Sequence, residues 1–249
     1  MIKSAAILTP NFINFIIVVN KDFLYASILR EIRFWPEKLV KKFSIQKRYV
    51  KFPIGSAFKS LFRECAAARL FFPDQMPDID KALYVDTDVI FLRPPEELWS
   101  EFNNFNQVQL SGFSPALTYY NPTQKAPYYG ETGLDTGVWL MNFELLRNFP
   151  GGWMESCNKA YKDYKNYIEF GDQGIVNIIF NKVPQYVYEL GCHWNFRFFL
   201  CKGGKNICNI SDSKGIYLLH GCGMAFYMNR DSKIKAVYEV WKNFNPVSL

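Results

Sequence analysis

The sequence contains no apolar run long enough to cross a membrane. A spanning helix needs about 20 predominantly apolar residues, whereas the most apolar run, residues 12–19, is short and is interrupted by Asn14. The first residues also lack the apolar stretch and cleavage site of a secretory signal peptide. We therefore expect a soluble chain with neither a membrane span nor a signal segment.

Histidines and paired cysteine motifs are also scarce. The 249 residues include two histidines and six cysteines, and no two cysteines have the C-x-x-C spacing of zinc or redox sites. Cys201 and Cys208 flank a glycine-containing loop that a disulfide could close, and Asn209-Ile210-Ser211 follows as an N-glycosylation sequon. Together these features favour a secretory compartment, where disulfides persist.

Charge is not concentrated in a recognisable motif. Lysines and arginines total 29 and acids 23, which gives a net charge of +6. The densest basic stretch, residues 38–51, is typical of a solvated helix face and an edge strand, and a nucleic-acid patch is the alternative. Because no nucleic-acid motif accompanies it, we predict no nucleic-acid partner. A small ligand that carries phosphate suits the charge equally well.

Apolar and aromatic residues, by contrast, are abundant, at 49% and 18% of the chain. With no repeat or polar linker, we predict a single domain over residues 1–249. Apolar runs predict strands over 15–19, 49–52, 82–85, 108–113, 138–142 and 216–219. Helical periodicity predicts helices over 22–34, 58–72, 153–167, 173–180 and 233–244, the clearest being 58–72 between a Ser56 N-cap and Pro73. This alternation predicts an α/β fold around a largely parallel sheet.

Two carboxylates stand directly after the predicted strand 82–85. Asp86 and Asp88 are two residues apart, so along an extended backbone their side chains project to the same side. Converging carboxylates repel unless a cation lies between them, and hard oxygen ligands favour Mg²⁺ or Mn²⁺. The alternative is a turn in which each aspartate caps a backbone N–H group. The apolar residues on both sides make uncompensated charge costly here, which favours the metal.

His220 follows the predicted strand 216–219 and precedes Gly221 and Gly223. Imidazole is a good ligand for Mn²⁺, and the glycines allow a ligand to approach the backbone closely. An ordinary hydrogen-bonded histidine at a strand end is the alternative. His193 has neither glycines nor acids beside it, and we interpret it as structural.

Two loops carry polar side chains suited to sugar hydroxyls. Asp135 and Gly137 precede the predicted strand 138–142. Asp172 and Gln173 stand at the start of the predicted helix 173–180. Acids and amides at loop ends can hydrogen-bond sugars. For Asp172, a simple N-cap of the helix is the alternative.

The order of these motifs resembles glycosyltransferase family 8, and within it the glucoside xylosyltransferases. The resemblance rests on residues 83–94 (LYVDTDVIFLRP), 127–133 (PYYGETG), 135–138 (DTGV), 171–177 (GDQGIVN), 192–197 (CHWNFR), 218–221 (LLHG) and 236–239 (AVYE). It implies a GT-A fold, which is a Rossmann-like nucleotide-diphospho-sugar transferase fold with a mixed central sheet flanked by helices. It also implies a retaining transferase that moves xylose from UDP-xylose to O-linked glucose on an EGF-like repeat of a glycoprotein. The alternatives are a transferase that uses UDP-glucose or UDP-galactose, and an inactive nucleotide-sugar-binding homologue.

The resemblance also implies roles for individual residues. Mn²⁺ would be bound by Asp86, Asp88 and His220, and would hold the UDP diphosphate. Asp172 and Gln173 would be the catalytic residues near the anomeric carbon. The substrate-binding residues would be Arg69, Asp86, Asp135, Gly137 and Gly223. The family's favoured mechanism is a front-face displacement in which a phosphate oxygen takes the acceptor proton.

Three departures from the family pattern stand out. The match begins in the family's first helix, so the first strand is expected to be missing. The stretch that begins at Gly223 has no basic group before Arg230, and Asp135 replaces a commoner asparagine.

The family belongs to the secretory pathway, which implies the lumen of the Golgi or ER for the protein. Acceptor contacts are expected on variable loops such as residues 114–125, so the sequence does not identify the acceptor.

Overall fold

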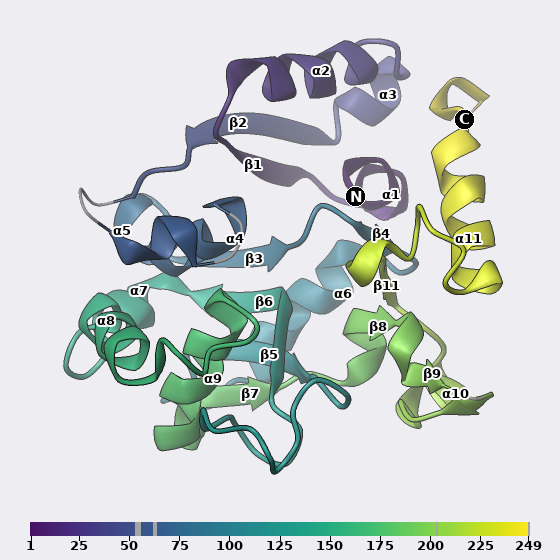
Figure 1. Ribbon diagram of the computed structural model, residues 1–249. Helices are drawn as coiled ribbons and strands as arrows, with labels where there is room; N and C mark the ends of the chain where they lie inside the picture. Colours follow the sequence, from purple (N-terminus) through teal and green to yellow (C-terminus); the bar gives the residue numbers. More distant parts are fainter. Residues whose placement is uncertain (53–55, 62–63, 203, 249) are drawn as a thin grey trace. The chain divides into compact units, whose positions relative to one another are not determined.

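The computed structural model describes residues 1–52, 56–61, 64–202 and 204–248 of the chain. They form two compact units. Unit 1 consists of Met1–Val50, Asp86–Ser100 and the chain from His193 onward, and unit 2 of Lys51–Val85 and Glu101–Cys192. Figure 1 labels the elements of both units.

Unit 2 is built on a four-stranded sheet with the order β3-β6-β5-β7. β6 pairs antiparallel with β3 and β5, and β5 pairs parallel with β7. Eight of the nine residues of β6 are buried, which explains why part of it reads as a continuous apolar run. The strands are β3 (Lys81–Val85), β5 (Ser111–Pro115), β6 (Leu134–Asn142) and β7 (Val187–Glu189).

Helices α8 and α9 pack against one another on this sheet, as Figure 1 shows. The core between them is aromatic: Trp139 of β6 contacts the rings of Phe113 and Trp153, and Phe180 of α9 contacts both of those rings. Such ring pairs contribute beyond the area they bury. The helices of unit 2 are α4 (Glu64–Ala68), α5 (Phe72–Gln75), α7 (Phe143–Arg147), α8 (Trp153–Tyr164) and α9 (Asp172–Lys182).

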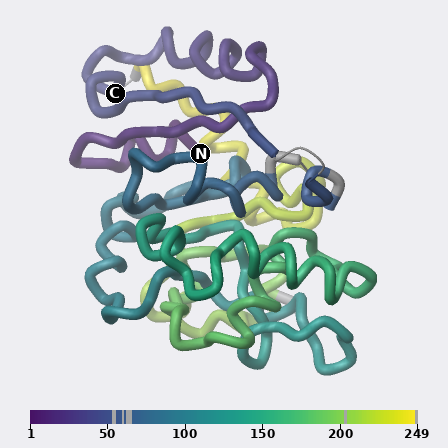
Figure 2. The backbone as a smooth tube through the Cα atoms, turned by 90° about the vertical axis from the view of Figure 1, so that its left-hand side faces the viewer, coloured from purple at the N-terminus to yellow at the C-terminus, as the bar shows by residue number. Residues whose placement is uncertain are grey.

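Unit 1 contains three small sheets. β1 and β2 pair in parallel, β11 pairs antiparallel with β4 and parallel with β8, and β9 and β10 form a hairpin. Helix α2 lies along the β1–β2 pair in both Figure 1 and Figure 2. The strands are β1 (Ile13–Val19), β2 (Phe43–Tyr49), β4 (Val89–Phe91), β8 (Phe196–Arg197), β9 (Cys201–Lys202), β10 (Lys205–Asn206) and β11 (Leu218–His220). The helices are α1 (Ile2–Leu8), α2 (Asp22–Ile32), α3 (Glu37–Val40), α6 (Pro95–Trp99), α10 (Ile210–Lys214) and α11 (Ser232–Asn243).

Several predicted elements are confirmed with shifted ends, and three predictions are wrong. The strand placed at 49–52 lies earlier, as β2, where its pairing with β1 defines it. The segment predicted as one helix over 58–72 is helical in its described residues but less regular: α4, η2 (Arg69–Phe71) and α5 follow one another without a break, and η1 (Ala57–Ser60) precedes them, with residues 62–63 outside the described part. Ser56 does cap η1, but Pro73 lies in the first turn of α5 and does not end a helix. The sheets are mixed rather than largely parallel.

The cysteines differ from the sequence-based expectation in one respect. Cys208 is disulfide-bonded, as is Cys192, whereas Cys201 carries a free thiol. A disulfide between Cys201 and Cys208 is therefore excluded. No helix in the described ranges is long and apolar enough to span a bilayer.

Candidate metal and sugar-binding residues

Unit 1 brings together the three residues predicted to bind a metal. Asp86 and Asp88 lie in the three-residue turn between β3 and β4, and His220 is the last residue of β11. β11 pairs with β4 so that His220 lies opposite Val89, and the Gly221 N–H group donates to the Asp88 carbonyl at 2.7 Å. Backbone hydrogen bonds thus fix residues that are 132 positions apart in the chain (220 − 88) side by side.

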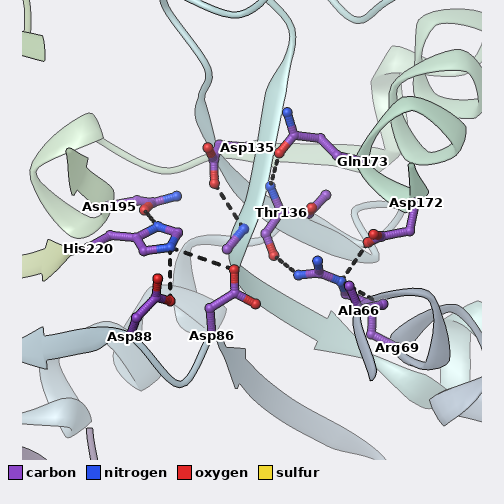
Figure 3. Close-up of polar contacts among 11 residues, drawn as sticks. Ala66, Arg69, Asp86, Asp88, Asp135, Thr136, Asp172, Gln173, Asn195 and His220 are labelled. Carbon is purple, nitrogen blue, oxygen red and sulfur yellow. Dashed lines mark hydrogen bonds and ion pairs between the residues drawn. The ribbon is translucent and has the colours of Figure 1, made fainter. Parts of the chain in front are cut away.

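The imidazole of His220 faces both carboxylates. Its Nε2 atom is 3.4 Å from Asp88 Oδ1 and 3.6 Å from Asp86 Oδ2 (Figure 3). One possible ligand atom from each residue lies within 4.8 Å of the others. His220 is buried, whereas the two aspartates are partly exposed, so the group opens toward solvent on its carboxylate side.

Asn195 orients the imidazole. Its Oδ1 atom is 2.8 Å from His220 Nδ1, and both side chains are buried. With the amide oxygen as acceptor, Nδ1 carries the proton and the lone pair of Nε2 points at the two carboxylates. This is the arrangement by which a neighbouring group prepares a histidine to bind a metal.

The donor set of these three residues fits a divalent cation. Two carboxylates supply hard oxygen ligands and compensate a double positive charge, and a neutral imidazole supplies nitrogen. Ligand atoms about 2.2 Å from an ion and at right angles are about 3.1 Å apart. The N···O distances of 3.4 and 3.6 Å are close to that spacing.

The loop after His220 has a restricted backbone. A Cβ atom on Gly221 would lie 2.3 Å from the ring of Phe226, so only glycine fits there. Gly223, predicted to bind substrate, has φ +64°, and the next residue, Met224, has φ 67° although it carries a side chain. A left-handed conformation costs a non-glycine residue free energy. Gly223 thus belongs to a tight turn shortly after His220, the candidate metal ligand.

Unit 2 gathers the residues predicted to bind the sugar around Arg69. Arg69 Nε is 2.6 Å from Asp172 Oδ2, and the side chains are 6% and 2% exposed. The guanidinium also donates to the carbonyls of Ala66 at 3.0 Å and Thr136 at 2.6 Å, and it stacks on the ring of Tyr84. The cation therefore ties η2, β6 and α9 together (Figure 3).

The N-cap alternative for Asp172 is wrong. Gly171 is the N-cap of α9, with a positive φ that suits glycine, and Asp172 is the first helical residue. Its carboxylate pairs with Arg69 instead. Asp172 and Arg69 are thus buried partners, an arrangement that suits a positioning role for both.

Gln173 and Asp135 are joined to the same strand. Gln173 Oε1 accepts from the Thr136 N–H group at 3.2 Å, while Asp135 Oδ1 accepts from the Gly137 N–H group at 2.9 Å. Asp135 and Thr136 are buried in β6. The D-T-G loop and the G-D-Q helix start, which are separate in the sequence, are therefore adjacent in unit 2, as the shared role predicted for them requires.

Two asparagines, one in each unit, hold candidate site residues in place. Asn177, on the turn of α9 after Gln173, accepts from the Leu134 N–H group at 2.7 Å and donates to Tyr120 Oη at 3.0 Å. Burial raises the pKa of Tyr120 above its ordinary value. Asn195 is the corresponding case in unit 1. Neither asparagine gives a sequence signal of such a role, because Leu134 and His220, which they contact, are remote in the chain.

The architecture is that of the GT-A fold, which solved glycosyltransferase structures share. Mouse xyloside xylosyltransferase 1 aligns with 90% of this chain and 91% of its own at a TM-score of 0.61 and 19% identity. Galactosyltransferase LgtC, in complex with donor and acceptor sugar analogues, aligns with 98% of this chain and 91% of its own at a TM-score of 0.68 and 18% identity. The GT-A fold is thereby confirmed.

The chain belongs to glycosyl transferase family 8, whose profile matches residues 56–225. It is 36% identical to glucoside xylosyltransferase 2 of Xenopus laevis over 98% of the chain, and 33% identical to glucoside xylosyltransferase 1 of Homo sapiens over the same share. The chain spans 61% and 58% of the length of these two relatives.

Proposed function

We propose that the protein is a metal-dependent, retaining glycosyltransferase that transfers xylose from UDP-xylose to O-linked glucose on a protein. The observation that carries the proposal is the group of Asp86, Asp88 and His220, whose Nε2 atom faces both carboxylates. Membership of family 8 and likeness to glucoside xylosyltransferases support the donor and the acceptor.

We assign Mn²⁺ to Asp86, Asp88 and His220. A bound divalent cation stabilises the negative charge that grows on a departing diphosphate. Asp86, Asp88 and His220 would hold the cation: the aspartates would compensate its charge, and Asn195 keeps the proton of His220 on Nδ1, which leaves the lone pair of Nε2 for the metal.

The residues around Arg69 are assigned to the donor sugar. Asp135 and Gln173 present their side chains from β6 and from the first turn of α9, where sugar hydroxyls find hydrogen-bonding partners. Arg69 and Asp172 hold the backbone that carries these two residues, through the ion pair and the Thr136 carbonyl. Gly137 and Gly223 are assigned to close approach of the substrate to the backbone.

The disulfide-bonded state of Cys192 and Cys208 supports a secretory compartment, because disulfides are rare where glutathione keeps thiols reduced. We propose the lumen of the Golgi or ER, with a glycoprotein as acceptor.

The test is UDP release by the chain with Mn²⁺, UDP-xylose and an EGF-like repeat that carries O-linked glucose. We expect turnover that needs the glucose on the repeat, is lost in Asp88→Ala and is retained in Asp163→Ala, which removes an exposed carboxylate paired with Lys159. Faster turnover with UDP-glucose or UDP-galactose would overturn the assignment of UDP-xylose as the donor. Mn²⁺-dependent UDP binding without turnover for any donor would identify an inactive nucleotide-sugar-binding protein instead.

A further inference from the structure

Three asparagines in unit 1 and unit 2 stand two residues before a serine, threonine or cysteine. They begin the tripeptides Asn121-Pro122-Thr123, Asn206-Ile207-Cys208 and Asn209-Ile210-Ser211. N-glycosylation needs such a tripeptide with a middle residue other than proline, and it marks an exposed segment of a secreted protein. The structure separates the three asparagines clearly.

Asn121 is excluded by its neighbour and by its own contacts. Proline occupies the middle position. The side-chain oxygen of Asn121 also accepts from the Thr123 N–H group at 3.0 Å and from the Thr123 hydroxyl, which closes a local turn.

Asn206 is committed to the fold. Its Nδ2 atom donates to the Cys208 carbonyl at 3.2 Å, to Ser211 Oγ at 2.7 Å and to Asp212 Oδ1 at 2.7 Å, and its Oδ1 accepts from the Cys208 N–H group. The third residue of its tripeptide, Cys208, is disulfide-bonded. A glycan on this nitrogen would break the hydrogen bonds that hold the start of α10.

Asn209 is used by the fold only through its backbone. It is exposed, and it is the N-cap residue of α10 without a side-chain cap hydrogen bond. Its carbonyl accepts from the Asp212 N–H group at 3.1 Å, which a change at the side-chain amide leaves intact. A capping residue of this type normally turns its side chain toward the helix N–H groups. Here the amide is left to solvent.

We propose that Asn209 is an N-glycosylation site. In the reaction, the Nδ2 atom of Asn209 forms a bond to C1 of the first sugar of a lipid diphosphate-linked oligosaccharide. The bond from C1 to the diphosphate oxygen breaks, the amide loses one proton, and the lipid diphosphate leaves. The proposal rests on the secretory compartment proposed above, which the disulfide at the adjacent Cys208 also supports.

The order of events follows from Ser211. In the folded chain its hydroxyl donates to the Cys208 carbonyl at 2.8 Å and accepts from Asn206 Nδ2. A transferase that reads this hydroxyl must therefore act before α10 closes. Threonine at position 211 preserves both the hydroxyl and the tripeptide, whereas alanine removes them.

The experiment directs the chain into the secretory pathway of cultured cells behind a cleavable signal sequence, so that entry into the lumen is not the variable. The secreted protein is treated with peptide N-glycosidase in heavy-oxygen water and mapped by mass spectrometry. We expect a single mobility shift and a labelled aspartate at position 209. The shift should vanish in Asn209→Gln and Ser211→Ala and persist in Ser211→Thr and Asn206→Gln.

Secreted wild-type protein with an unmodified Asn209 would overturn the proposal, as would modification at Asn206. Turnover with UDP-xylose is measured on the same samples and on unglycosylated protein from bacteria. Loss of turnover with an intact glycan at Asn209 would count against the proposed transferase and not against the glycosylation site. The wild-type peptide map decides the question even if Asn209→Gln fails to fold.

Discussion

Replacing Asp172 by asparagine tests whether the buried ion pair with Arg69 holds this part of unit 2 together. The substitution preserves the shape of the side chain but removes the charge that lies 2.6 Å from Arg69 Nε. Arg69, 5% exposed, then keeps the carbonyls of Ala66 and Thr136 and the ring of Tyr84, but no counter-charge among these contacts.

Removing one partner of a buried ion pair costs about 3 to 5 kcal/mol, because a buried charge is left uncompensated. We expect the low end, about 3 kcal/mol, because the asparagine oxygen still faces the guanidinium. For a chain of this length, that loss lowers Tm by about 6 to 12 °C.

The assay is thermal unfolding followed by tryptophan fluorescence, since Trp139 and Trp153 are buried in the core of unit 2. A double-mutant cycle with Arg69→Met should show a coupling free energy of about 2 kcal/mol or more. Each single variant leaves one buried charge without its partner, whereas the double variant leaves no buried charge at all. Asp163→Asn is the control, because its partner Lys159 is exposed and the pair is worth less than about 1 kcal/mol. Additive effects in the cycle would refute this account of Arg69 and Asp172.

Three further predictions follow from single contacts. Asn195→Ala should weaken Mn²⁺ binding about 10- to 100-fold in calorimetric titration, because it releases the His220 ring; equal affinity would contradict the orienting role. Gly133→Ala should lower the urea midpoint more than Gly130→Ala: both have positive φ, but the new Cβ lies 2.2 Å from an aromatic ring at 133 and meets no heavy atom within 4 Å at 130. Brief alkylation at neutral pH should label Cys201 and spare Cys157, since burial raises the Cys157 pKa and covers the thiol; the reverse order would show that the core is open there.

The convergence of Asp86 and Asp88 could be predicted because its signal is local, whereas their grouping with His220 came from the family resemblance. Two acids two residues apart after a short apolar strand are expected to project to the same side. In the structure, possible ligand atoms of Asp86, Asp88 and His220 lie within 4.8 Å of one another. The shared role of the D-T-G and G-D-Q loops likewise came from the family resemblance, and remote contacts hold them together in the structure.

The predictions failed where remote contacts decide. The periodicity of 58–72 predicts one regular helix, yet the geometry changes to 3₁₀ at η2. There Arg69 is bound to the carbonyl of Thr136, which lies in a distant strand. The Asp172 carboxylate could satisfy an N-cap by local rules, but a buried cation is a stronger partner than a backbone N–H group. Asn195 gave no signal because its partner, His220, is 25 residues away.

The candidate ligand set in unit 1 depends on the register of one short ladder. β11 pairs with β4 at three positions, Leu218 with Phe91, Leu219 with Ile90 and His220 with Val89. Because side chains alternate along a strand, a slip of one residue would turn His220 to the opposite face of the sheet.

Three residue pairs alone would define this register weakly, but further backbone hydrogen bonds hold the ladder at both ends. Leu92 N–H donates to the Tyr217 carbonyl at 2.9 Å, and Gly221 N–H donates to the Asp88 carbonyl at 2.7 Å. The second of these bonds joins the backbone of Asp88 directly to the residue after the histidine. Gly221 therefore has two reasons to lack a side chain: its Cβ would strike Phe226, and its amide must reach the turn that carries both aspartates.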